Sequence, residues 1–345
     1  MARREFIKRD GDTMKTTVIE KKAILQVSEL KQHFVLKKEV MFQAKQVVKA
    51  VDGISFDLFP GETLSIVGES GCGKSTTGRS ILRLDEPTEG NVLFRGQSLT
   101  KMNKRELRNI RGDIQVIFQD PYASLNPRRT IRQMLEEAMA IQKVLPPNQR
   151  EARMLELMNH VGLRPEYLER YPHEFSGGQR QRIGIARALA VNPKIIICDE
   201  AVSALDVSIQ AQILNLLKKL QKDFDLTFLF ISHDLSVVRH ISDRVMVMYL
   251  GKIVEISDTA SLFKNPLHPY TKALLSAIPV TDQTQRKERI ILVGDVPSPI
   301  NPPGGCRFHT RCPFATDLCQ KEEPTLRESA DQHFVACHYA EKLSS

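Results

Sequence analysis

A glycine-rich stretch between a strand-like run and a helical pattern constrains this chain more than any other feature. Residues 68–75 read Gly-Glu-Ser-Gly-Cys-Gly-Lys-Ser, which fits the pattern G-x4-G-K-S/T. A strand-like run, residues 63–67, precedes it, and a helix-like stretch follows from Lys74 towards Leu84. In this order of strand, loop and helix, backbone N–H groups surround phosphate oxygens at the helix N-terminus. The sequence therefore predicts an α/β fold with a parallel sheet core and a phosphate-binding loop.

The residues of this loop have separate expected roles. Lys74 supplies a point charge to the phosphates, and the Ser75 hydroxyl is expected to ligate Mg²⁺. Cys72 fills a position that needs a small residue. A structural glycine turn is the alternative, but the place between a strand and a helix favours phosphate binding. The predicted phosphate contacts are Ser70, Gly71, Cys72, Gly73, Lys74, Ser75 and Thr76.

Two carboxylates follow a second strand-like stretch. Residues 195–198 are three isoleucines and a cysteine, and they lead into Asp199 and Glu200. Open α/β sheets present ligands at the carboxyl ends of their strands. We expect Asp199 to hold Mg²⁺, directly or through water, and Glu200 to polarise the water that attacks a γ-phosphate. A solvated strand end is the alternative interpretation.

A second glycine-rich stretch, Phe175-Ser176-Gly177-Gly178-Gln179, precedes a helical pattern near Arg180. It predicts either a second phosphate contact or a simple helix cap. With this stretch, the motifs resemble those of the ATP-binding cassette (ABC) ATPases in order and spacing. The order is the phosphate loop, Gln119, FSGGQ at 175–179, CDE at 198–200, SALD at 203–206 and His233.

The resemblance implies a RecA-like core, an antiparallel β subdomain and a helical subdomain, with ATP and Mg²⁺ as cofactors. It implies that Gln119 contacts Mg²⁺ and couples the helical insert to a membrane partner. Asp206 would lie in the loop through which two cassettes communicate, although it is also placed to N-cap the next helix. His233 would contact the γ-phosphate and orient the attacking water. The implied nucleotide contacts in the second glycine-rich stretch are Ser176, Gly177, Gly178 and Gln179.

Two further points follow from the same resemblance. An aromatic residue upstream of the phosphate loop is expected to stack on adenine, and Phe34 is the choice by position, with Phe42 as the substitute. Family members usually carry proline after the catalytic glutamate, whereas this chain has Ala201. Since the carboxylate of Glu200 is intact, we expect altered loop stiffness and retained chemistry.

Composition shifts divide the chain into three parts. Residues 1–23 form a charged, aperiodic, basic extension with no predicted regular element. Residues 24–258 form the predicted nucleotide-binding domain, whose helical subdomain covers about 120–190. Residues 259–345 form a proline-rich, irregular C-terminal extension that holds four of the six cysteines.

Charge and hydropathy narrow the class of protein. A net charge of +8 favours an anionic partner, but the chain has no Trp and no cluster of aromatic residues for stacking single-stranded nucleic acid. No apolar run approaches the ~20 residues of a membrane-spanning helix, and the N-terminus lacks the apolar core of a secretory signal. We expect a protein of the cytoplasm whose cysteines are thiols or ligands.

Three stretches sharpen the resemblance to the ATPase subunits of bacterial oligopeptide and dipeptide importers. They are 120–128, His268-Pro-Tyr-Thr with Leu274-Leu275, and the tail 306–313. The phrases EFSGGQRQRIGIARALA and VSALDVSIQAQ look more like the second, F-type ATPase of such importers. Importers of nickel or metal chelates share much of this pattern and are the alternative for the cargo.

The tail has a cysteine pattern of its own. Cys306, Cys312, Cys319 and Cys337 stand as C-x5-C-x6-C-x17-C. Four thiolates can hold an iron–sulfur cluster or zinc, and the absence of a C-x2-C pair disfavours an ordinary zinc ribbon. The resemblance implies a 4Fe-4S cluster, with zinc and reduced thiols as alternatives. His309 and His338 are expected to form local hydrogen bonds.

The resemblance also implies partners. A single cassette holds half of each composite ATP site, so we expect a paralogous ATPase facing this one in a heterodimer. Two transmembrane permease subunits and an extracellular peptide-binding protein would complete an importer, which places this chain peripherally on the cytoplasmic face of the cell membrane. A soluble ABC ATPase that acts on nucleic acid or ribosomes is the rival function, although no nucleic acid is expected here.

Overall fold

A computed structural model of the chain describes residues 3–6, 17–20, 22–36, 46–120, 124–278 and 289–343. Phe42, the substitute for adenine stacking, lies outside the described residues, as do residues 121–123 of the stretch that follows Gln119.

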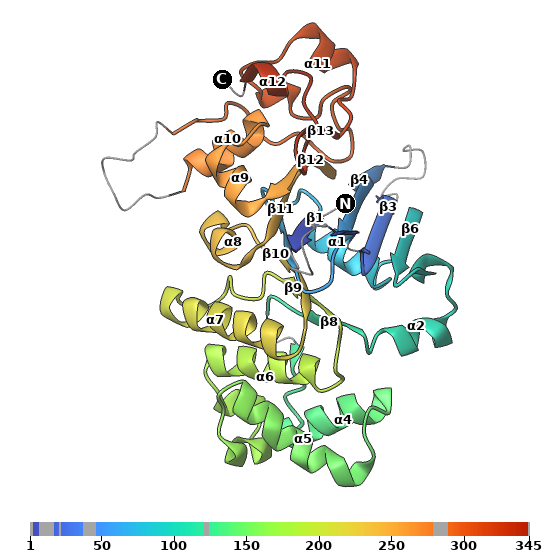
Figure 1. Ribbon diagram of the computed structural model, residues 1–345, viewed down its shortest axis with the longest axis vertical. Helices are drawn as coiled ribbons and strands as arrows, with labels where there is room; N and C mark the ends of the chain where they lie inside the picture. The colour runs from blue at the N-terminus through green and yellow to red at the C-terminus, as the bar shows by residue number, and fades with distance from the viewer. Residues whose placement is uncertain are drawn as a thin grey trace, which may run out of the picture.

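An eight-stranded sheet forms the centre of the molecule, in the order β13-β14-β12-β11-β5-β10-β9-β8 (Figure 1). The five strands from β11 to β8 are parallel, which confirms the predicted core, and β12, β14 and β13 continue it antiparallel. All residues of β5 and β10 are buried, as in parallel strands that are covered on both faces. The strands are β5 (Thr63–Val67), β8 (Ile114–Ile117), β9 (Ile195–Asp199), β10 (Thr227–Ile231), β11 (Arg244–Tyr249), β12 (Lys252–Asp258), β13 (Arg327–Ala330) and β14 (His333–Val335).

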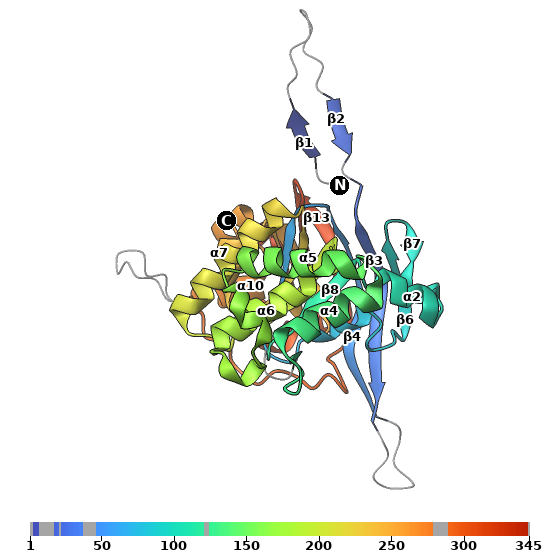
Figure 2. The ribbon, with the colours of Figure 1, turned by 90° about the horizontal axis from the view of Figure 1, so that it is seen from below.

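A second, antiparallel sheet lies beside the core. It runs in the order β4-β3-β6-β7 and comprises β3 (Leu25–Val35), β4 (Val47–Leu58), β6 (Glu89–Phe94) and β7 (Gln97–Ser98). Strand β3 extends well beyond the apolar residues at its start, since it pairs with β4 as far as Val35, opposite Val47. Figure 2 shows this sheet, with α2 at its edge, on one side of the molecule and α7 and α10 on the other.

The described residues of the segment predicted as a helical insert contain the helices α4 (Ile131–Gln142), α5 (Pro147–His160) and α6 (Gly177–Leu189). Their apolar residues recur every three or four positions and pack into one core with α7. Thr130 and Ser176 cap α4 and α6 through capping boxes, which fixes where both helices begin. In Figure 1 these helices lie at the end of the molecule opposite the C-terminal tail.

The remaining helices connect or cover strands. They are α1 (Lys74–Ile81), α2 (Lys104–Ile110), α7 (Val207–Asp223), α8 (Leu235–Ile241), α9 (Thr259–Lys264), α10 (Pro269–Ser276), α11 (Asp317–Lys321) and α12 (Ala340–Leu343), with 3-10 turns at 99–101, 165–169, 172–174 and 309–311.

Both ends of the chain differ from the sequence-based expectation. Within residues 1–23, β1 (Arg3–Phe6) and β2 (Thr17–Glu20) pair antiparallel where no regular element was predicted. The tail was expected to be irregular, yet β14 pairs with β12 and adds β13 to the core sheet. Glu255 of β12 stands opposite Val335 of β14, a partner eighty positions along the chain that no local pattern reveals.

Candidate functional site

Three loops carrying the predicted catalytic residues meet at one edge of the sheet. Strand β10 lies between β5 and β9, and all three run parallel, so their carboxyl ends share an edge. The phosphate loop follows β5, Glu200 follows β9 and His233 follows β10. Open parallel sheets bind ligands beyond this edge, which places the candidate site there.

The phosphate loop is shaped by glycines that no other residue could replace. Gly68 has φ 153°, and a Cβ there would lie 2.2 Å from the carbonyl oxygen of Met248. Gly73, just before α1, has φ 107°, and its Cβ would lie 2.2 Å from the carbonyl oxygen of Ala50. The loop thus curls tightly against β4 and β11, with its N–H groups at the start of a helix.

Lys74 lies inside this curl and is only 4% exposed. Its Nζ donates hydrogen bonds to the carbonyl oxygens of Gly68 at 2.8 Å and Glu69 at 3.0 Å. Cys72 is buried, and burial raises the pKa of its thiol, so it stays neutral and fills space as expected. The loop places one buried ammonium group where phosphate oxygens would lie.

Two of the three residues predicted to contact Mg²⁺, Ser75 and Asp199, are in contact with each other. The Ser75 hydroxyl donates a 2.6 Å hydrogen bond to Oδ1 of Asp199, although the two residues are 124 positions apart. Burial raises the pKa of the Asp199 carboxyl, Ser75 opposes this shift and the neighbouring Glu200 adds to it. A hydroxyl and a carboxylate side by side offer the oxygen ligands that Mg²⁺ prefers.

Glu200 and His233 form the predicted pair beside this contact. Nδ1 of His233 lies 3.5 Å from Oε2 of Glu200, and the side chains are 56% and 17% exposed respectively. Glu200 adopts φ 49°, a left-handed conformation that is uncommon outside glycine. Its N–H donates to the carbonyl oxygen of Ile231, which holds this conformation in place. Ala201 behind it is buried. Strained backbone held by its surroundings is typical of functional sites.

The second glycine-rich stretch begins α6 with a capping box between Ser176 and Gln179. The Ser176 hydroxyl accepts from the N–H of Gln179, and the Gln179 side chain accepts from the N–H of Ser176. Added Cβ atoms at Gly177 and Gly178 would meet Leu205 and Ile209, next to the SALD loop. Ser176 is exposed. Within a single chain, the stretch therefore acts as a helix cap. The N-terminus of α6 is exposed at Ser176, where a ligand held by another molecule could reach it.

Comparison with known sequences gives the same family from both halves of the chain. The family described as "ABC transporter" matches residues 51–203, and the family described as "Oligopeptide/dipeptide transporter, C-terminal region" matches residues 254–319. The chain is 55% identical over 325 residues to the oligopeptide transport ATP-binding protein AppF of Bacillus subtilis (strain 168), covering 93% of this chain and 99% of the relative. This chain belongs to the ATP-binding subunits of oligopeptide and dipeptide ABC transporters.

Other relatives and solved structures agree with this ABC ATPase assignment. Identity to the oligopeptide transport ATP-binding protein OppF of Escherichia coli (strain K12) is 53% over 323 residues, covering 92% of this chain and 96% of the relative. A dimeric post-hydrolysis structure of the ATP-binding cassette MJ0796, bound to ADP and Pi, is 30% identical with a TM-score of 0.60, covering 68% of this chain and 98% of that one. CbiO1 of Clostridium perfringens also has a TM-score of 0.60, at 26% identity, covering 71% of this chain and 92% of that one.

Three further predicted residues of the ABC ATPase lie at exposed positions. Asp206 occupies the N-cap position of α7, yet its side chain makes no capping hydrogen bond, so capping does not explain the aspartate. Gln119 lies two residues beyond β8, on the same sheet edge as Asp199. Phe34 of β3 is 38% exposed opposite Val48 and presents a ring at the antiparallel sheet.

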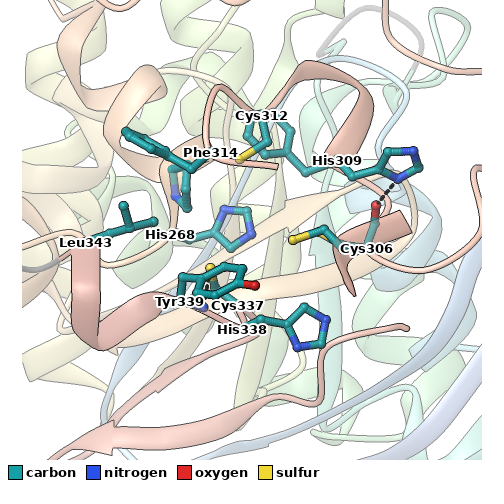
Figure 3. A pocket seen from close by; sticks show the side chains of 12 residues that line it. His268, Cys306, His309, Cys312, Phe314, Cys337, His338, Tyr339 and Leu343 are labelled. Atoms are coloured by element: carbon teal, nitrogen blue, oxygen red, sulfur yellow. Dashed lines mark hydrogen bonds between the residues drawn. The ribbon is translucent and has the colours of Figure 1, made fainter. Parts of the chain in front are cut away.

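The four tail cysteines line one pocket. Cys306, Cys312 and Cys337 surround it with His268 and Tyr339 in Figure 3, and Cys319 of α11 completes the set. None of the described residues that line it is an aspartate or a glutamate. Burial raises the pKa of the Cys306 and Cys312 thiols to about 11 each, with further increases from neighbouring cysteines. Cys306 and Cys312 are therefore neutral thiols at pH 7.

The two histidines beside the cysteines bond locally, as predicted. Nδ1 of His309 lies 2.8 Å from the carbonyl oxygen of Cys306, and Nε2 of His338 lies 3.0 Å from that of Glu322.

No group of three or more His, Cys, Asp or Glu side chains in the described ranges is placed to hold a metal ion, so the zinc alternative has no built site and the iron–sulfur expectation gains no support. None of the helices in these ranges is long and apolar enough to cross a membrane.

Sequence reasoning missed two residues that touch the phosphate loop. Arg311 and Tyr270 belong to quoted tail motifs, but no role was assigned to either. Arg311 forms an ion pair with Glu69, the second residue of the loop, and the Tyr270 hydroxyl accepts from the Glu69 N–H. The only available signal was a carboxylate inside a phosphate loop, which demands a nearby cation.

Proposed function

We propose that this chain is the ATP-hydrolysing subunit of a bacterial importer that couples ATP turnover to the uptake of di- and oligopeptides. The observation that supports this most is the convergence of Lys74, the Ser75–Asp199 contact and the Glu200–His233 pair beyond one sheet edge. Such an edge provides charge, metal ligands and a base for phosphoryl transfer to water.

The proposed division of labour follows from these positions. Lys74 and the loop N–H groups bind the phosphates, while Ser75 and Asp199, with Gln119 near by, would hold Mg²⁺, which neutralises developing charge when bound. Glu200 accepts a proton from the attacking water, and His233 orients that water against the γ-phosphate. Phe34 supports adenine by stacking.

We propose that a second cassette completes the site. Ser176 and Asp206 are exposed, and Gly177 and Gly178 lie next to Leu205 and Ile209 of their own chain. Ser176 and Asp206 are therefore accessible to the nucleotide of a facing subunit, which we propose to be a paralogous ATPase. In this proposal the cassette comprises residues 24–258, with its helical part at about 120–190, between a basic extension 1–23 and the tail 259–345.

Two permease subunits and an extracellular peptide-binding protein would complete the importer, with this chain bound peripherally at the cytoplasmic face. The names of the relatives support peptides as cargo; import of nickel or metal chelates is the second candidate. Uptake of a labelled dipeptide and of Ni²⁺ in cells with and without this chain separates the two. Loss of peptide uptake alone supports the proposal. Loss of Ni²⁺ uptake alone contradicts it, as would RNA binding by a chain that never co-fractionates with permeases.

Lys74→Ala tests the nucleotide site. Removing the buried ammonium group is expected to weaken MgATP binding by about tenfold or more, because charge-assisted hydrogen bonds contribute about 1.5–3 kcal/mol each. The measurement is a MgATP titration of the full-length chain. Lys264→Ala, at the last position of α9, is the matched control. Unchanged MgATP affinity in Lys74→Ala would show that the loop binds no phosphate.

We also propose that the tail pocket holds a 4Fe-4S cluster. The four cysteine sulfurs are soft donors that suit iron and sulfide. Among the described residues no group of side chains is placed to hold a single metal ion, and a cluster is wider than a single ion. Cys306, Cys312, Cys319 and Cys337 would be its ligands, and the cluster would supply a rigid cross-link with redox capacity. Deprotonation of the buried thiols would accompany its binding.

Anaerobic purification tests this proposal. The full-length chain is expected to show the broad visible absorbance of a cluster, with iron and sulfide in equal amounts, and Cys312→Ser is expected to lose it. Cys198→Ala, a buried cysteine of β9 outside the pocket, is the matched control and should keep the absorbance. A colourless protein with one zinc, or one with four reactive thiols and no metal, would identify the respective alternative.

A further inference from the structure

Glu69 places a carboxylate within the phosphate loop itself. Its side chain is 28% exposed, and its backbone carbonyl already accepts from Lys74. A negative charge at this position repels the oxygens of a bound triphosphate unless a cation compensates for it. Because the nearest loop cation, Lys74, is needed by the phosphates, compensation for Glu69 has to come from elsewhere.

The tail provides that compensation through Arg311. Nη1 of Arg311 lies 2.7 Å from Oε2 of Glu69, and Nη2 lies 3.1 Å from Oε1, which makes a two-bond guanidinium–carboxylate pair. The Arg311 side chain is only 8% exposed, and its guanidinium lies 5.9 Å from the ring centroid of Tyr249. A guanidinium group is not deprotonated in proteins, so the cation is permanent.

The backbone of Glu69 is held from the same side. Its N–H donates a 2.8 Å hydrogen bond to the Tyr270 hydroxyl of α10. Tyr270 is fully buried, in contact with Tyr249 at 4.8 Å and Phe308 at 5.4 Å between ring centroids. The aromatic cluster of Tyr270, Tyr249 and Phe308 therefore holds the backbone of the loop at Glu69 in place. Arg311 holds the Glu69 carboxylate.

We propose that Arg311 is a positioning residue of the ATP site, which neutralises Glu69 and holds the phosphate loop in the conformation that accepts MgATP. The inference rests on the proposed function, since it assigns a partner within the chain to the same nucleotide site. It gives the tail a role in nucleotide affinity that does not depend on any bound metal. The rival interpretation is a structural staple that anchors the tail and leaves nucleotide affinity unchanged.

The test is a double-mutant cycle with Arg311→Met and Glu69→Gln in the full-length chain, using MgATP affinity and the KM and kcat of ATP hydrolysis as readouts. Arg311→Met is expected to raise the Kd and KM for MgATP by about tenfold or more, from the ~1.5–3 kcal/mol of a charged hydrogen-bonded pair. In the Glu69→Gln background the same substitution should change them less than about threefold, since no uncompensated carboxylate remains. Tyr270→Phe, which removes one hydroxyl, should raise KM more than it lowers kcat.

Arg327→Met is the matched control. Arg327 forms a similar two-bond pair with Glu341 within the tail, at 2.6 and 3.1 Å, and does not touch the loop. It should leave KM unchanged. If Arg311→Met does not fold, Arg311→Lys replaces it, because lysine keeps the charge and loses the second bond.

The inference is overturned if Arg311→Met leaves the affinity for MgATP unchanged, or raises KM equally with and without the Glu69 carboxylate. Lys74→Ala separates this failure from that of the proposed function. If Lys74→Ala loses MgATP binding while Arg311→Met keeps normal affinity, only the inference about Arg311 is wrong. If Lys74→Ala still binds MgATP, the proposed nucleotide site itself is wrong.

Discussion

Replacing Glu200 with glutamine is expected to lower steady-state ATP hydrolysis by about 10²–10⁴-fold, the contribution of a positioned general base. The amide keeps the shape of the side chain but cannot take a proton from water. MgATP binding should persist, because Lys74 and the loop N–H groups are unchanged. Phosphate release by the assembled ATPase and MgATP titration of the variant measure the two effects.

The surroundings of Glu200 are the reason why we expect no neighbour to replace it. Its left-handed backbone is fixed by the hydrogen bond to Ile231, and its carboxylate is the group that lies 3.5 Å from His233. Asp199 is already engaged by Ser75. Glu156→Gln, on the surface of α5, is the matched control and should hydrolyse ATP normally. Hydrolysis at the normal rate in Glu200→Gln would mean that another group activates the water.

Local patterns were sufficient to bring the candidate site residues to one edge of the sheet. A phosphate loop must follow a strand and begin a helix, so residues 68–75 predicted both β5 and α1. The Ser75–Asp199 contact follows from parallel topology, because Asp199 ends β9 and Ser75 begins the helix that follows β5, and the carboxyl ends of both strands share one edge. Neither step needed a long-range contact to be known beforehand.

The tail could not be predicted in the same way, because its contacts join distant parts of the chain. Arg311 and Glu69 are 242 positions apart, and β14 joins the sheet through a pairing of two residues with β12. Such contacts are decided by tertiary packing, which short-range periodicity does not report. The proline-rich stretch predicted loops, whereas the strands are short and gain their order from the sheet that they extend.

Ser176 and Asp206 show why a motif can have two valid explanations. Ser176 caps its own helix, so its presence needs no ligand. Asp206 occupies the corresponding position of α7 without forming the cap, and the local explanation fails there. The sequence alone cannot separate these cases, since both residues are favoured N-caps; the hydrogen bonds decide.

Substituting Glu255 with alanine is expected to lower the free energy of unfolding by about 3–5 kcal/mol, the range for breaking a buried charged network. Glu255 is fully buried in β12. Its Oε1 accepts from the N–H of Leu267 at 2.7 Å and lies 2.7 Å from Nε2 of His333, and its Oε2 accepts from the N–H of His268 at 3.0 Å. The alanine variant would leave these groups buried and unsatisfied.

One carboxylate thus joins the core sheet, the start of α10 and strand β14 of the tail. Burial lowers the pKa of His268 to about 4, so its ring is neutral at pH 7 and its backbone N–H is what needs the acceptor. Glu255→Gln should lower the free energy of unfolding less than Glu255→Ala, because the amide oxygen of glutamine still accepts a hydrogen bond. It should still destabilise the protein, because the NH₂ group would face a donor. Thermal unfolding with Glu328→Ala as the exposed control should therefore rank alanine lowest in Tm, glutamine next and the control nearest the unsubstituted protein. Equal Tm values would show that the tail is anchored by its apolar contacts alone.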